Sequence, residues 1–115
     1  MMVTIYHNPR CSKSRQTLAL LEENGVDPKI VEYLKTPPTT AELKRILKNL
    51  GLKPRDILRK GEAVYAELGL KDGTHTGDEL LALMVENPIL IERPIVVAGD
   101  HAAIGRPPEA VLKIL

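Results

Sequence analysis

The chain has 115 residues, a mass of 12.7 kDa and 43% apolar residues, which suits one folded domain. It contains three Tyr and no Phe or Trp, so stacking of aromatic side chains on nucleic acid bases is poorly supported. Its net charge of +1 provides no attraction to nucleic acid or to an anionic membrane. No apolar run approaches the roughly 20 residues that cross a bilayer, and the first residues do not resemble a signal peptide. We therefore expect a soluble, cytoplasmic monomer with no nucleic acid or membrane partner.

The chain has a single cysteine, Cys11, which limits its chemistry. One thiol forms no disulfide within the chain, and structural zinc sites built on paired thiolates are excluded. The histidines His7, His75 and His101 lie too far apart in the sequence to present two ligands on one helix face. The sequence therefore predicts no metal site, and any redox reaction of Cys11 needs a second thiol from another molecule.

The first part of the chain predicts a β-α-β unit. Residues 3–6 (VTIY) are typical of a short strand, and residues 12–24 carry Leu18 and Leu21 at helical spacing. Asn24-Gly25 is a helix stop, and residues 29–34 (KIVEYL) predict a second strand. A right-handed crossover through the helix makes the two strands parallel.

Residues 38–88 predict a helical insertion within a single domain, residues 1–115. The capping boxes that start its longer helices are Thr39-x-x-Glu42 and Thr76-x-x-Glu79. Gly51 ends the first of these helices and Asn87-Pro88 ends the second. Shorter helical segments are expected at residues 54–58 and 64–68.

The last part of the chain predicts two strands and a helix. Residues 94–98 and 102–104 predict an antiparallel hairpin around the turn Gly99-Asp100. Pro107 and Pro108 stand where a last helix would begin, with Glu109 in its first turn. The order β-α-β, helical insertion, β-β-α predicts an α/β fold with a mixed four-stranded sheet.

Cys11 lies between the first predicted strand and the first predicted helix. Unpaired backbone N–H groups and the positive end of the helix dipole favour a thiolate there. Residues 1–21 contain Arg10, Lys13 and Arg15 and no acidic residue, so the same segment attracts anions. The alternative is that Cys11 is a small buried apolar residue, which is the commoner role of a free cysteine. A strand-to-helix turn flanked by polar residues favours the reactive interpretation.

Ser14 completes the motif C-x-x-S, with serine where dithiol oxidoreductases carry their second cysteine. Its hydroxyl is one helical turn from Cys11 and would donate a hydrogen bond to the thiolate; a capping role for Ser12 or Ser14 is the alternative. The phosphatase motif C-x5-R is absent, since Thr17 stands at the arginine position and Arg15 is at the wrong offset. That class of oxyanion enzyme is therefore disfavoured.

Four motifs stand in order along the chain: Ile5-Tyr6-His7-Asn8-Pro9-x-Cys11-x-x-Ser14-Arg15, then residues 58–60 (LRK), 92–97 (ERPIVV) and 105–109 (GRPPE). With them, essentially the whole chain resembles the arsenate reductases that depend on glutathione and glutaredoxin. The resemblance implies a thioredoxin-like fold with a helical insertion, which agrees with the order of elements above. It also puts Arg93-Pro94 where that fold places a cis-proline facing the active cysteine.

The resemblance implies a role for each matching residue. Cys11 would be the nucleophile, and Arg59, Arg93 and Arg106 would bind and polarise the oxyanion. His7 would help to keep the thiol ionised. The supporting residues would be Asn8, Ser14, Arg15 and Pro94. Guanidinium groups suit this task because they stay charged and bind the oxygens of a tetrahedral oxyanion in pairs.

The implied reaction reduces arsenate to arsenite. The Cys11 thiolate attacks arsenic, glutathione acts as co-substrate on the adduct, and glutaredoxin resolves the mixed species. No tightly bound cofactor is expected. The expected partners are arsenate, glutathione and glutaredoxin.

Two other functions remain open on the sequence. The first is a glutathione-dependent thiol oxidoreductase with another substrate, which would need Cys11 and would be indifferent to Arg59 and Arg106. The second is a non-enzymatic, redox-responsive regulator that binds RNA polymerase. Regulators of this kind with an internal switch use C-x-x-C, which Ser14 excludes here.

Overall fold

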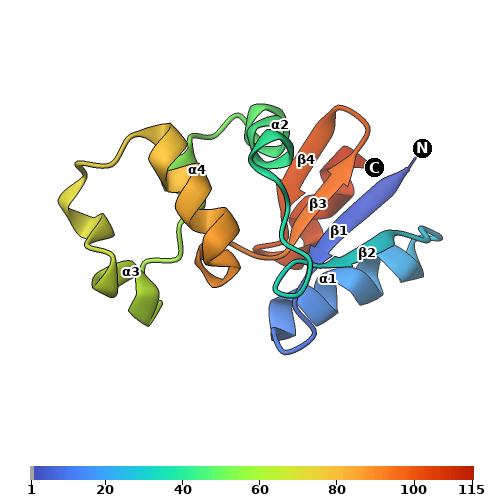
Figure 1. Cartoon of the computed structure of the whole chain (residues 1–115). Coiled ribbons are helices and arrows are strands. Elements are labelled where there is room, and N and C mark those ends of the chain that lie inside the picture. The colour runs from blue at the N-terminus through green and yellow to red at the C-terminus, as the bar shows by residue number, and fades with distance from the viewer. Residues whose placement is uncertain (1) are drawn as a thin grey trace. The chain divides into compact units, whose positions relative to one another are not determined.

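The computed structural model describes residues 2–115 (Figure 1). The chain divides into two compact units. The first joins the chain up to Thr36 with Arg93–Leu115, and we call it the sheet unit. The second, Pro37–Glu92, contains the segments expected to form the insertion, and we call it the helical unit.

The sheet unit is built on a four-stranded sheet of order β2-β1-β3-β4 (Figure 1). Strands β1 (Val3–His7) and β2 (Lys29–Glu32) are parallel and joined through helix α1 (Ser12–Glu23). Strand β3 (Ile95–Ala98) is antiparallel to β1 and forms a hairpin with β4 (His101–Ile104). The predicted α/β fold with a mixed sheet is confirmed.

The last segment of the sheet unit differs in detail from the prediction. Pro108–Ile114 forms a 3₁₀ helix, η4, rather than an α-helix. Proline and an acidic residue mark a helix start, but they do not select between the two hydrogen-bonding patterns. Val111 of η4 is fully buried, so the segment still contributes to the core as expected.

The core of the sheet unit joins β1, β3, α1 and η4. Its buried members are Val3, Ile5, Leu21, Val96, Ala98 and Val111. Along β1 the side chains alternate, so Val3, Ile5 and His7 are all buried on one face. On α1 the buried residues Ser14, Thr17 and Leu21 follow helical spacing. The alternation that buries the aliphatic residues of β1 therefore also turns His7 toward α1.

The helical unit consists of short helices. They are α2 (Thr40–Leu50), η1 (Pro54–Ile57), α3 (Ala63–Glu67), η2 (Leu70–Asp72), α4 (Gly77–Glu86) and η3 (Pro88–Leu90). Both predicted capping boxes are present, at the starts of α2 and α4. Gly51 ends α2 in the left-handed region with φ 70°, a conformation that favours glycine. Within residues 2–115, no helix has the length and apolar character needed to cross a membrane.

We expect Ile5→Ala to destabilise the sheet unit strongly. Ile5 is fully buried in the core, and truncation of such a side chain typically costs about 2 to 5 kcal/mol of unfolding free energy. Its pairing partner on β2, Ile30, is 49% exposed, so Ile30→Ala is a matched control with a cost below about 1 kcal/mol. Urea unfolding followed by circular dichroism measures both, and equal losses would contradict the described core.

Candidate active site

Three loops of the sheet unit meet at one edge of the sheet because of the strand pairing. Tyr6 of β1 pairs with Ile95 of β3, and Ile95 pairs with Ile104 of β4. The residues after β1 (8–11), before β3 (93–94) and after β4 (105–106) therefore lie at the same edge. The register of the sheet thus brings together segments from the two ends of the chain.

Cys11 occupies the cap position at the start of α1. Its backbone is extended, with φ −92° and ψ 122°, and its N–H donates to the Asn8 carbonyl over 3.0 Å to close a turn. The next hydrogen bond of the helix runs from the Arg15 N–H to the Cys11 carbonyl, also over 3.0 Å. Cys11 is 8% exposed, so its sulfur lies in a nearly closed position at the positive end of the helix dipole.

Arg106 provides a positive charge directly beside the sulfur. Its Nη2 lies 3.7 Å from Cys11 Sγ, and its Nε donates to the Arg93 carbonyl oxygen over 2.8 Å. A guanidinium at this distance is placed to contact an oxyanion bound to the sulfur. Two of the predicted oxyanion-binding arginines are therefore linked to each other, and one of them contacts the cysteine.

The loops that carry Arg93 and Arg106 are packed closely together. The Gly105 N–H donates to the Pro94 carbonyl over 2.9 Å, which continues the β3-β4 pairing beyond the strands. Arg93-Pro94 is a cis peptide bond, as the resemblance implied, and Arg106-Pro107 is a second one that the sequence did not indicate. Pro94 thus lies in the same edge cluster as Arg106.

Ser14 binds the residues before Cys11 and not the thiol. Its Oγ lies 2.6 Å from His7 Nδ1 and accepts a hydrogen bond from the Asn8 N–H over 3.0 Å. The proton of the His7–Ser14 hydrogen bond comes from the hydroxyl or from Nδ1, according to the tautomer. Across residues 2–115 no hydrogen bond joins Ser14 to Cys11, and no side chain caps the N-terminal end of α1. Both interpretations of Ser14 from the sequence are therefore replaced by a role in fixing β1 to α1.

His7 is buried on β1, and this lowers its pKa. Burial disfavours the charged imidazolium and is the largest effect; Glu32 opposes it and Arg15 adds to it. A neutral His7 suits its close hydrogen bond with Ser14. Since His7 contacts Ser14, its implied part in keeping the Cys11 thiol ionised stays a prediction.

Arg15 and Asn8 hold the loop before Cys11. Arg15 Nη1 donates to the Pro9 carbonyl over 2.9 Å, and Asn8 Oδ1 accepts from the Arg10 N–H over 3.0 Å. Each hydrogen bond restrains the backbone of residues 8–10. Both residues therefore restrain the loop, and their supporting role in the reaction stays a prediction.

Arg59, the remaining predicted oxyanion-binding residue, belongs to the helical unit. Its guanidinium contacts two carboxylates of the same unit, Glu62 and Glu92. The cluster at the edge of the sheet therefore contains Cys11, Arg93 and Arg106. The two carboxylates that contact Arg59 belong to the helical unit.

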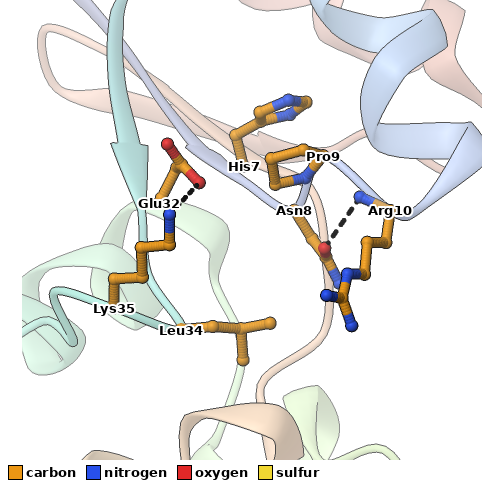
Figure 2. Close-up of a pocket in the computed structure, with 7 residues that line it drawn as sticks. All are labelled: His7, Asn8, Pro9, Arg10, Glu32, Leu34 and Lys35. Atoms are coloured by element: carbon orange, nitrogen blue, oxygen red, sulfur yellow. Dashed lines mark hydrogen bonds and ion pairs between the residues drawn. The ribbon is translucent and has the colours of Figure 1, made fainter.

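A cavity of about 390 Å³ lies next to the loop before Cys11 (Figure 2). Its lining residues are His7, Asn8, Pro9, Arg10, Glu32, Leu34 and Lys35. They come from the loop after β1 and the end of β2, which is where parallel sheets commonly bind ligands. Figure 2 shows Glu32 and Lys35 paired on one side of the cavity and Arg10 on the other. Glu32 and Lys35 were not predicted as site residues, although the parallel pairing of β1 and β2 that places them beside the loop was predicted.

Within residues 2–115, no group of three or more His, Cys, Asp or Glu side chains is arranged to hold a metal ion.

A sequence model of the ArsC family matches residues 6–114. The chain belongs to the ArsC family. It is 55% identical to "Uncharacterized protein YfgD" of Escherichia coli K12, over 98% of this chain and 96% of that protein. It is 50% identical to an arsenate reductase of Rhizobium meliloti, over 100% of this chain and 82% of that protein.

Solved structures of this family have the same fold. An arsenate reductase from Vibrio cholerae superposes with a TM-score of 0.97 at 54% identity, over 100% of this chain and 98% of that one. The thioredoxin-like fold implied by the motifs is therefore confirmed for this ArsC family chain.

We expect the stability of the chain to fall as the pH drops below about 6.5, because of His7. Its pKa is lowered in the folded state, so between that pKa and 6.5 the unfolded chain binds more protons. The contribution of His7 is thus complete above pH 6.5 and is lost as the pH falls through this window, by about 1.4 kcal/mol for each unit of lowering.

Urea unfolding between pH 5 and pH 8 measures this effect. His7→Asn removes the titrating group and should flatten the profile over the window. Glu32→Gln removes the charge that opposes the lowering, so the loss should extend to lower pH. Profiles of equal slope in wild type and His7→Asn would contradict the assignment.

We expect Gly105→Ala to lower the stability of the chain and to change the reactivity of Cys11. A Cβ at Gly105 would lie 2.5 Å from Thr17 Oγ1 and 2.7 Å from Pro94 Cγ, so the Pro94 loop or α1 must shift. The predicted loss of stability is about 1 to 3 kcal/mol, and the rate of Cys11 alkylation by iodoacetamide should change as Arg106 moves. Gly61→Ala, where a Cβ meets no atom within 4 Å, is the control. Identical stability and alkylation in the two variants would refute this packing argument.

Proposed function

We propose that this chain is an arsenate reductase in which Cys11 is the single nucleophile and glutathione and glutaredoxin supply the electrons. The observation that supports it most directly is the 3.7 Å contact between Arg106 Nη2 and Cys11 Sγ at the start of α1. Membership of the ArsC family, with relatives named arsenate reductases, supports the same conclusion.

The arginines have separate roles in this proposal. Arg106 stabilises the thiolate before arsenate binds and then contacts an oxygen of the bound oxyanion. Arg93 and Arg59 bind further oxygens, so the negative charge that gathers on them during attack is offset. Arsenate is mainly a dianion near neutral pH, and fixed guanidinium groups bind it without a proton transfer.

The electrons balance with two thiols from other molecules. The Cys11 sulfur forms a bond to arsenic as one oxygen leaves as water, and the glutathione sulfur then bonds to the same arsenic as a second oxygen leaves as water. A glutaredoxin thiolate attacks the glutathione sulfur, and the electrons of the arsenic–sulfur bond reduce arsenic from the pentavalent to the trivalent state. Water displaces Cys11, arsenite leaves, and the glutaredoxin–glutathione disulfide carries the oxidising equivalents. These steps need a compartment that keeps glutathione reduced, which supports the expected cytoplasmic location.

Arsenate-dependent oxidation of NADPH, coupled through glutathione, glutaredoxin and glutathione reductase, tests the proposal. Wild type should need arsenate and glutathione together, and Cys11→Ser should be inactive. Arg93→Ala and Arg106→Ala should each lower kcat/KM by at least about 30-fold, since loss of one charge-assisted contact costs about 2 kcal/mol or more. Arg45→Ala removes an exposed arginine of α2 and serves as the charge-matched control.

A different result would assign the alternative enzyme. If arsenate adds nothing while a glutathione mixed disulfide is reduced through Cys11, the chain is a thiol oxidoreductase and the proposal fails. In that case Arg93→Ala should retain activity, because a disulfide substrate presents no oxyanion.

A further inference from the structure

Arg59 is held between two carboxylates of the helical unit. Its Nη1 lies 3.0 Å from Glu62 Oε1, and its Nε lies 3.8 Å from Glu92 Oε1. The side chains are 23%, 23% and 29% exposed for Arg59, Glu62 and Glu92. Because all three are mostly screened from water, these ion pairs are stronger than pairs on an open surface.

The backbone fixes Glu62 next to Arg59. The Glu62 N–H donates to the Arg59 carbonyl over 3.3 Å, which closes a turn just before α3. Glu62 Oε1 also accepts a hydrogen bond from Arg59 Nη1. The turn therefore places the Glu62 carboxylate next to the Arg59 guanidinium.

A separate backbone contact fixes Glu92. Leu58 and Ile91 form an isolated antiparallel bridge. The N–H groups of Arg59 and Glu92 each donate across this bridge to a backbone oxygen, over 2.8 Å. Arg59 and Glu92 therefore lie diagonally across the bridge, and their long side chains reach each other.

Two carboxylates therefore contact one guanidinium, Glu62 at Nη1 and Glu92 near Nε. An anion that approaches these two nitrogens competes with carboxylates that are already there. We propose that Glu62 and Glu92 are positioning residues that keep Arg59 occupied at rest, so that the oxyanion must displace a carboxylate to bind. This inference rests on the proposed function, in which Arg59 binds arsenate.

This arrangement makes binding at Arg59 depend on the charge of the anion. A weakly bound monoanion does not compete with a carboxylate that the backbone already holds in place. A dianion that accepts two hydrogen bonds from one guanidinium does compete. The carboxylates therefore lower the affinity for arsenate and raise the selectivity for dianionic oxyanions over monoanions.

Calorimetric titration with inorganic arsenate, without any thiol donor, tests the inference on the full chain. Glu62→Gln keeps the size of the side chain and removes its charge. We expect it to lower the Kd for arsenate about threefold to tenfold, the range given by loss of one partly exposed competing charge. Glu62→Asp keeps the charge and should bind arsenate as weakly as wild type does.

Two further variants separate a direct effect from a general change of charge. Glu67→Gln makes the same change of charge at an exposed residue of α3 and should leave the Kd unchanged. In an Arg59→Ala background, Glu62→Gln should give no gain, because the carboxylate acts through Arg59. Arg59→Ala alone should raise the Kd for arsenate.

The inference fails if Glu62→Gln binds arsenate no more tightly than wild type. It also fails if Glu67→Gln gives the same gain, or if the gain persists without Arg59. The turnover assay reports separately on the proposed function. If the variants show this binding pattern but wild type does not reduce arsenate, the reductase proposal fails and the role of the carboxylates stands. If wild type reduces arsenate but the variants do not show the pattern, the reductase proposal stands and the role of the carboxylates fails.

Discussion

The register of the four-stranded sheet is the constraint on which the site depends. Because Ile95 pairs with both Tyr6 and Ile104, the loop after β1 and the loops on either side of the β3-β4 hairpin share one edge. A shift of one residue would turn Val3, Ile5 and His7 out of the core. The same pairing would then no longer bring Arg106 to Cys11. Core packing and site geometry are thus fixed by one set of main-chain hydrogen bonds.

Short-range patterns in the sequence were sufficient to predict most of the helices and strands. The capping boxes of α2 and α4 and the Gly99-Asp100 hairpin involve residues a few positions apart, so their chemistry is visible in the sequence. The 3₁₀ geometry of η4 and the short helix η2 were not predicted. Local start signals do not select between α and 3₁₀ hydrogen bonding, and a three-residue helix is too short to show a periodic pattern.

The site was predicted less completely than the fold. The motifs pointed to Cys11, and the structure places Arg106 beside it, but the partner of Ser14 was not foreseen. That contact depends on which face of β1 is buried, and the predicted strand, residues 3–6, ended before His7. The pairing of Arg59 with Glu92 was also missed, because a single β-bridge leaves no periodic pattern in the sequence.

The use of serine at position 14 has a consequence for the lifetime of the protein. A Cys11 oxidised to sulfenic acid finds no thiol in its own chain with which to form a protective disulfide. Further oxidation to sulfinic acid is irreversible for most proteins. The 8% exposure of Cys11 slows the approach of an oxidant, and any rescue of the sulfenic acid must come from thiols in solution. The survival of the cysteine under oxidative stress is therefore set by the concentration of reduced thiols around the protein.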